Sequence, residues 1–311
     1  MTSIQLLSYV SVVVFLIGVS RTAIKYLSMP IHLRWELYPV AHEKGRDYGG
    51  SYHEVLDWWV KPREKSLINE LKFMIPEILL IRALFHHNRK LWMTSFPFHA
   101  GLYMLVGLLC LLVVGAVTEA FGVVIAADAP NTCARAIYYV TIGFGALGLI
   151  CAAWGCGRLL FMRFTDRDLN SFTTPLDYIN LILVFAVLVC ALAVWVFVDP
   201  SFSLARRYIQ SLITFEPFSP MGWAFTGQIV LFSVLMIYFP FTHMTHFFTK
   251  YFTYHKVRWE DAPNIKGSKI ETRVRSVLER KVQWAAPHVA TGKKWSEIVE
   301  EQKSETEERE G

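Results

Sequence analysis

The sequence has few charged residues for its size. Asp, Glu, Lys and Arg make up 18% of the 311 residues, whereas 53% are hydrophobic, and the mean hydropathy is +0.34. This balance excludes an ordinary soluble domain and indicates helices in a lipid bilayer. The apolar runs also lack acidic and basic residues at mid-depth, and no internal repeat is evident. Both absences count against a transporter, which needs such groups to couple ions.

Cysteine is also scarce, and the spacing of the cysteines indicates no metal or redox site. The five cysteines form no CxxC pair and do not cluster with histidine; four of them lie within apolar runs, at Cys110, Cys151, Cys156 and Cys190. Iron–sulfur clusters and zinc sites need thiolates grouped near loops. We therefore predict neither a cluster nor a disulfide network in this chain, and interpret the cysteines as small packing residues.

Five apolar segments are long enough to cross a hydrocarbon core of about 30 Å, which takes roughly 20 helical residues. They cover residues 4–27, 96–118, 136–157, 178–198 and 221–247. The first is interpreted as a retained span and not a signal peptide, because its charges, Arg21 and Lys25, follow the apolar run. The predicted fold class is an all-α integral membrane bundle of five transmembrane helices.

Basic residues gather in alternate loops. Ten Lys and Arg lie in residues 28–95, three in 158–175 and thirteen after residue 248, whereas the loops on the other side share only Arg135, Arg206 and Arg207. By the positive-inside rule, the N-terminus lies outside and the C-terminus lies in the cytoplasm. The net charge of +5 therefore reflects topology, and we expect no nucleic-acid partner.

The chain then divides into four parts. Residues 1–27 form the first span, 28–95 a cytoplasmic loop, 96–247 the remaining spans, and 248–311 a soluble cytoplasmic tail. Within the loop, residues 66–92 alternate apolar and charged positions at helical spacing, which predicts an amphipathic helix along the inner face, kinked at Pro76. In the tail, residues 269–284 are predicted to be helical, and the two tryptophans Trp284 and Trp295 indicate a partner surface.

Three of the ten histidines lie within or at the edge of a span: His99, His243 and His246. His99 opens the second span and His246 closes the fifth, and because these spans run in opposite directions both residues lie at the cytoplasmic end. A haem iron in a membrane bundle needs two such imidazoles at matched height. We therefore predict His99 and His246 as the iron ligands, although a histidine at a span boundary can also be an interfacial anchor.

For several residues near these histidines, the sequence leaves more than one role. His243 lies three residues before His246, roughly 60° round the same predicted helix, so geometry leaves it as an alternative ligand. Otherwise it packs or hydrogen-bonds a ring edge or a quinone. Arg82, Arg89 and Lys90 are placed to neutralise haem propionates, and a solvated basic face is the alternative for each.

Three motifs resemble the gamma subunit of respiratory nitrate reductase and its relatives, the membrane cytochromes b of heterodisulfide-reductase-type and sulfite-reductase-linked complexes. These motifs are FPFHAG at the start of the second span, PFTHMTH at the end of the fifth, and QWAAPHVATGKKW in the tail, which is similar to the branch coupled to iron–sulfur subunits. Members of this family usually bind two b haems. His99 and His246 match the inner pair, but the outer pair falls at Leu109 and Gln228, which do not ligate iron, so we predict one haem.

The resemblance implies a b-type cytochrome membrane subunit that exchanges electrons between menaquinone or menaquinol and a cytoplasmic iron–sulfur subunit of heterodisulfide-reductase type. It identifies no catalytic residue. Both a chain fed by an electron-transfer flavoprotein and a quinol-oxidising reductase are compatible with it. The alternatives are a di-haem quinol-oxidising cytochrome b and a haem-free membrane anchor. In each case the chain is a multi-pass protein of the cytoplasmic membrane.

Overall fold

Helices form almost all the regular structure in the part of the chain described by the computed structural model, which covers residues 2–28, 56–57, 60–61, 66–219, 222–246, 248–249, 266–286, 289 and 291–301. The chain divides into two units. The first combines Met1–Val19 with Met74–Thr245, and the second combines Ser20–Phe73 with His246–Gly311. Each is described separately below.

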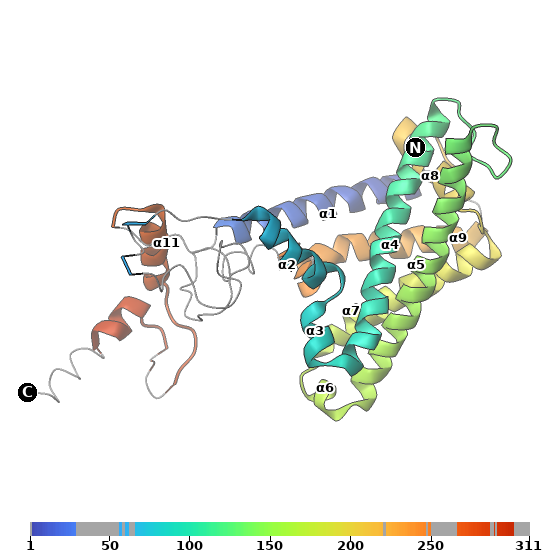
Figure 1. The fold of residues 1–311 in the computed structure, drawn as a ribbon. Helices are drawn as coiled ribbons and strands as arrows, with labels where there is room; N and C mark the ends of the chain where they lie inside the picture. The colour runs from blue at the N-terminus through green and yellow to red at the C-terminus, as the bar shows by residue number, and fades with distance from the viewer. Residues whose placement is uncertain are drawn as a thin grey trace, which may run out of the picture. The chain divides into compact units, whose positions relative to one another are not determined.

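Five helices are long and apolar enough to cross a membrane, which confirms the predicted all-α fold with five spans (Figure 1). They are α1 (Ser3–Ser28), α4 (Arg89–Ala120), α5 (Thr132–Thr165), α7 (Pro175–Phe197) and the segment Gly222–Phe241, in which α9 (Gly222–Tyr238) continues into the 3₁₀ turn η3 (Phe239–Phe241). Both α4 and α5 extend beyond the predicted apolar runs. The orientation of the termini stays a prediction.

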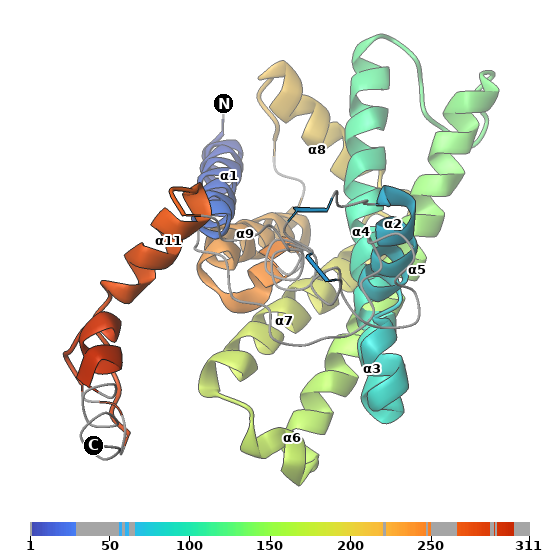
Figure 2. The ribbon, with the colours of Figure 1, turned by 60° about the vertical axis from the view of Figure 1, so that its left-hand side comes forward.

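The helices α4 and α5 pack against each other, and small residues let their backbones approach where they cross (Figures 1 and 2). A Cβ atom on Gly101 would lie 2.4 Å from the backbone nitrogen of Ala152, and one on Gly155 would lie 2.6 Å from the backbone nitrogen of Phe98. Neither position therefore has room for a side chain. This tight contact fixes the stretch of α4 that carries His99.

Replacing Gly101 with alanine is expected to destabilise the bundle by about 1–3 kcal/mol, because the added methyl group meets backbone and not a flexible side chain. The matched control is Gly143→Ala on α5, where a Cβ meets no atom within 4 Å. Alanine there should be neutral or stabilising, since it favours helix over glycine. Equal thermal unfolding midpoints for the two variants in detergent would contradict this account of the contact.

At the end of α4 away from His99, the chain forms a helix that the sequence interpretation treated as loop, α8 (Ser203–Thr214). Arg206 on α8 is 3% exposed. Its Nε lies 2.9 Å from Oε1 of Glu119, and its Nη2 donates to the backbone oxygen of Ile125 at 3.0 Å. Arg206 is therefore a buried ion-pair partner and not one of the exposed loop charges.

The N-terminal part of α1 is tied to α8 and the segment after it by polar side chains. Gln5 is fully buried, and its Nε2 donates to Oγ of Ser211 at 3.1 Å and to the backbone oxygen of Glu216 at 2.7 Å. Ser8 Oγ and Tyr208 Oη share a hydrogen bond of 2.7 Å. Such bonds hold helices together where lipid supplies no hydrophobic drive for association.

The prediction of one continuous amphipathic helix over residues 66–92 is wrong, because the structure has separate helices there. The structure has α2 (Leu67–Leu79), α3 (Arg82–His87) and then the start of α4 at Arg89. Pro76 lies inside α2, and the break falls at Ile81, whose φ of 51° is left-handed. Glu77 Oε2 accepts from the backbone N–H of Ala83 at 2.9 Å and stabilises the turn.

In the second unit, the tail contains α11 (Lys269–Leu278), which ends before the predicted limit of residue 284. Beyond it, an isolated antiparallel bridge joins Lys281 to Lys294. A small apolar cluster is formed by side chains of the tail, among them Val282, Val289, Ile298 and Trp295. The tail after residue 266 therefore contains a packed element, with the half-exposed Trp284 ring 6.1 Å from that of Trp295.

Candidate functional site

His99 lies in α4, one helical turn after Ser95, and is half-buried. Its Nδ1 is 2.7 Å from the backbone oxygen of Ser95 and 3.3 Å from the Ser95 hydroxyl. A carbonyl oxygen can only accept, so Nδ1 carries the proton and Nε2 carries the lone pair. Metal-binding histidines typically show this arrangement, in which a backbone carbonyl orients the ring and sets the tautomer. The donor chemistry at His99 therefore fits a haem iron.

The end of the fifth span differs from the prediction. The predicted helix over residues 221–247 stops at Tyr238, and two 3₁₀ turns follow, η3 and η4 (His243–Thr245). Pro240 has no N–H to continue the helical hydrogen bonds, and Thr242 Oγ1 donates to the backbone oxygen of Phe239 at 2.9 Å. The placement of His243 and His246 on one α-helical face is therefore wrong.

His243 instead forms an ion pair across the bundle. Its Nε2 lies 2.9 Å from Oδ1 of Asp177 in the first turn of α7; the His243 side chain is 57% exposed and that of Asp177 is 18% exposed. The other carboxylate oxygen of Asp177 accepts from the backbone N–H and the hydroxyl of Thr174, which forms a capping box at the start of α7. The sequence analysis did not single out Asp177, although Thr174-Pro175-Leu176-Asp177 carries the pattern of a helix start.

One turn further along α7, a second polar pair joins α7 to α9. Tyr238 Oη donates to Oδ1 of Asn180 at 2.8 Å. Asn180 is 4% exposed, and its Nδ2 has no hydrogen-bond partner among the residues that the structure describes. Asn180 was not predicted, since a lone amide in an apolar run gives no pattern to recognise.

His246, the other predicted ligand, is exposed and is the first residue of the second unit, whereas His99 belongs to the first. Their pairing around an iron therefore stays a prediction.

Two of the basic residues assigned to haem propionates have local partners. The Arg89 guanidinium lies 3.6 Å from the ring centroid of Phe85 and 5.2 Å from that of Trp92. Lys90 Nζ is 2.9 Å from Oδ2 of Asp166, and this hydrogen bond is the main cause that lowers the pKa of the Asp166 carboxyl. These contacts favour a packing role, and the propionate role of Arg82 and Arg89 stays a prediction.

The positions of an outer haem pair hold residues that do not ligate iron. Leu109 on α4 is 44% exposed, and Gln228 lies on α9. The ring of Phe202 covers Gly145 so closely that a Cβ there would be 2.2 Å away, and Trp195 stacks on Phe202 with ring centroids 6.5 Å apart. The Phe202 ring therefore packs directly against the backbone of α5 at Gly145.

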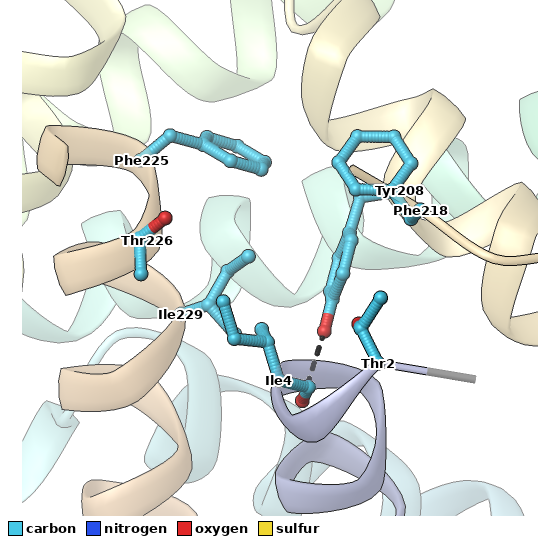
Figure 3. A pocket seen from close by; sticks show the side chains of 7 residues that line it. All are labelled: Thr2, Ile4, Tyr208, Phe218, Phe225, Thr226 and Ile229. Atoms are coloured by element: carbon cyan, nitrogen blue, oxygen red, sulfur yellow. Dashed lines mark hydrogen bonds between the residues drawn. The ribbon is translucent and has the colours of Figure 1, made fainter. Parts of the chain in front are cut away.

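A small hollow lies near the start of α1, between α8 and α9 (Figure 3). Its lining includes Tyr208, Phe218 and Phe225, and Tyr208 Oη donates to the backbone oxygen of Ile4 at 3.3 Å. The hollow has about 190 Å³ of empty volume. This volume includes open solvent, and the side chains leave no enclosed space there for a quinone head group.

Comparison with known families agrees with this architecture. The family model described as nitrate reductase gamma subunit matches residues 83–260, more than half of the chain. This stretch includes four of the five spans and all three candidate histidines. No curated protein and no solved structure matches the chain. The chain belongs to the nitrate reductase gamma subunit family, multi-pass cytochromes b of the cytoplasmic membrane that bind haem b and associate with oxidoreductase subunits and quinones.

Proposed function

We propose that the chain carries electrons between menaquinone or menaquinol and a cytoplasmic iron–sulfur subunit of heterodisulfide-reductase type, through one haem b held by His99 and His246. The observation that carries this proposal is the hydrogen bond from His99 Nδ1 to the Ser95 carbonyl, within the stretch matched by the family. That bond orients the ring as a ligand while Nε2 keeps its lone pair. When bound, the haem supplies one-electron transfer, and bis-imidazole ligation with burial sets its potential.

The contact between His243 and Asp177 favours His246 as the second ligand. Nε2 of His243 is already 2.9 Å from a carboxylate oxygen, and its side chain is mostly exposed. An iron at that nitrogen would have to displace Asp177. His246 closes the family motif PFTHMTH.

A single haem accords with the residues at the outer positions. Leu109 has no donor atom for iron, and an amide such as Gln228 is not a usual haem ligand. With the haem only at the cytoplasmic side, roughly half of a ~30 Å core has no carrier from this chain. Electron transfer then stays on the cytoplasmic side of the membrane.

The partner is proposed from the tail and the loop before the second span. The tail stretch QWAAPHVATGKKW is similar to the branch of the family coupled to iron–sulfur subunits. Within it, Trp284 is half exposed next to Trp295, and solvent-exposed tryptophan rings are typical of a protein docking site. Residues 28–95 are the other proposed contact.

The test is a spectrum of the purified chain under anaerobic conditions, before and after addition of menadiol, a short-chain naphthoquinol. A Soret band that shifts to the reduced b-type spectrum with menadiol, and returns on adding an oxidised iron–sulfur partner, is the expected result. A chain purified from cells with ample haem that shows no Soret band would instead be a haem-free anchor.

A further inference from the structure

A polar cluster lies where α7 begins and α9 ends, two helices that pack against each other (Figure 2). It combines the ion pair of His243 with Asp177 and the hydrogen bond of Tyr238 with Asn180. Asp177 and Asn180 are three residues apart on α7 and so share a helix face. The cluster therefore runs from an exposed imidazole to a buried amide within one helical turn.

The buried end of the cluster has a hydrogen-bond donor to spare. Asn180 Oδ1 accepts from Tyr238, while Nδ2 has no partner within the described ranges. Buried donors in native proteins are rarely left unpaired, since that costs free energy. Leu181 follows Asn180 in the sequence and Leu235 lies three residues before Tyr238, and both pack against the apolar core, so a neutral acceptor is favoured over an anion. A quinone carbonyl is an acceptor of this kind.

The exposed end of the cluster can exchange protons. An imidazole can carry a proton between a buried group and water, and the His243 side chain is 57% exposed. The charges that act on the Asp177 carboxylate are those of Arg163 on α5 and of His243 itself. The Arg163 guanidinium is held in place by a hydrogen bond from its Nη1 to Oγ1 of Thr173 at 2.8 Å.

We propose that Asn180 Nδ2, with its side chain held by Tyr238, donates a hydrogen bond to one carbonyl of a quinone head group, and that the Asp177–His243 pair exchanges protons with it. This inference rests on the proposed quinone reaction and adds the residues that bind and protonate the substrate. It also gives a role to His243 that does not involve ligating iron.

In the reducing direction, the electrons come from the iron–sulfur partner. At the bound carbonyl the C=O double bond becomes a C–O single bond and an O–H bond forms, while the N–H bond at Nε2 of the protonated His243 breaks and the proton passes by way of the Asp177 carboxylate. His243 Nε2 then regains a proton from water. The second carbonyl oxygen takes its proton from water at the membrane boundary, which completes two electrons and two protons per quinol. Quinol oxidation runs the same steps in reverse.

The test measures the rate at which menadiol reduces the haem of the full-length chain, from pH 5 to 8, in Asp177→Asn, His243→Gln and Asn180→Leu. Each variant's haem content is measured first. Asp177→Asn and His243→Gln should keep the haem, slow its reduction by about 100-fold, and flatten the pH profile. Asn180→Leu should instead raise the half-saturating menadiol concentration about tenfold, the effect of one hydrogen bond.

The matched control is Asp166→Asn, which removes a carboxylate that also caps a helix, at the start of α6 (Arg167–Ser171). It should behave as wild type, and dithionite should reduce the haem fully in every variant. Wild-type rates and pH profiles in all three site variants would overturn the inference, as would loss of haem from both Asp177→Asn and His243→Gln. A different result would contradict the proposed function itself: the wild-type chain would contain no haem that menadiol reduces.

Discussion

Replacing His99 with alanine is expected to abolish haem binding, because it removes one of the two proposed iron ligands and the ring that the Ser95 carbonyl orients. The measurement is the haem content of the purified variant by the pyridine haemochrome method, normalised to protein. Far-UV circular dichroism should stay helical, since α4 is held by its contact with α5 and not by the imidazole.

The control for His99→Ala is Ser95→Ala, which removes the Ser95 hydroxyl but leaves the backbone oxygen that accepts from Nδ1. That variant should retain its haem. A His99→Ala protein that still contains its full pigment would rule out His99 as a ligand and would contradict the proposed site.

The second large effect is expected to separate two histidines that are three residues apart. His246→Ala should also lose the haem completely, whereas His243→Ala should keep it, since His243 Nε2 is bound to Asp177. Electron paramagnetic resonance of the two variants would show which imidazole is axial. Loss of haem from His243→Ala alone would reverse the ligand assignment and would require the ion pair with Asp177 to open.

The five spans could be predicted from the sequence because bilayer thickness dictates their length, whatever their neighbours. The details around the site could not, because they depend on contacts distant in sequence. Asp177 meets His243 only once α7 and α9 pack together. The sequence alone indicates that Arg206 is a charge in a loop, whereas in the structure it forms an ion pair with Glu119.

Of the two corrected helix boundaries, one had a local signal in the sequence and the other had none. Pro240 indicated a possible end to the last helix, and the structure ends α9 at Tyr238, two residues before it. The break at Ile81 had no such signal, since a β-branched residue with positive φ is rare. Hydrogen bonds from Ala83 to Glu77 and from Trp92 to the Leu80 backbone oxygen stabilise that turn.

The number of haems in the purified chain tests the central claim most directly, since one haem confines electron transfer to one side of the membrane and two would carry electrons across it. The pyridine haemochrome assay, calibrated against amino-acid analysis, should give one haem b per polypeptide, with a single bis-imidazole signal in electron paramagnetic resonance. Two haems per polypeptide would contradict the account, because the chain would then need an outer ligand pair at positions where it has Leu109 and Gln228.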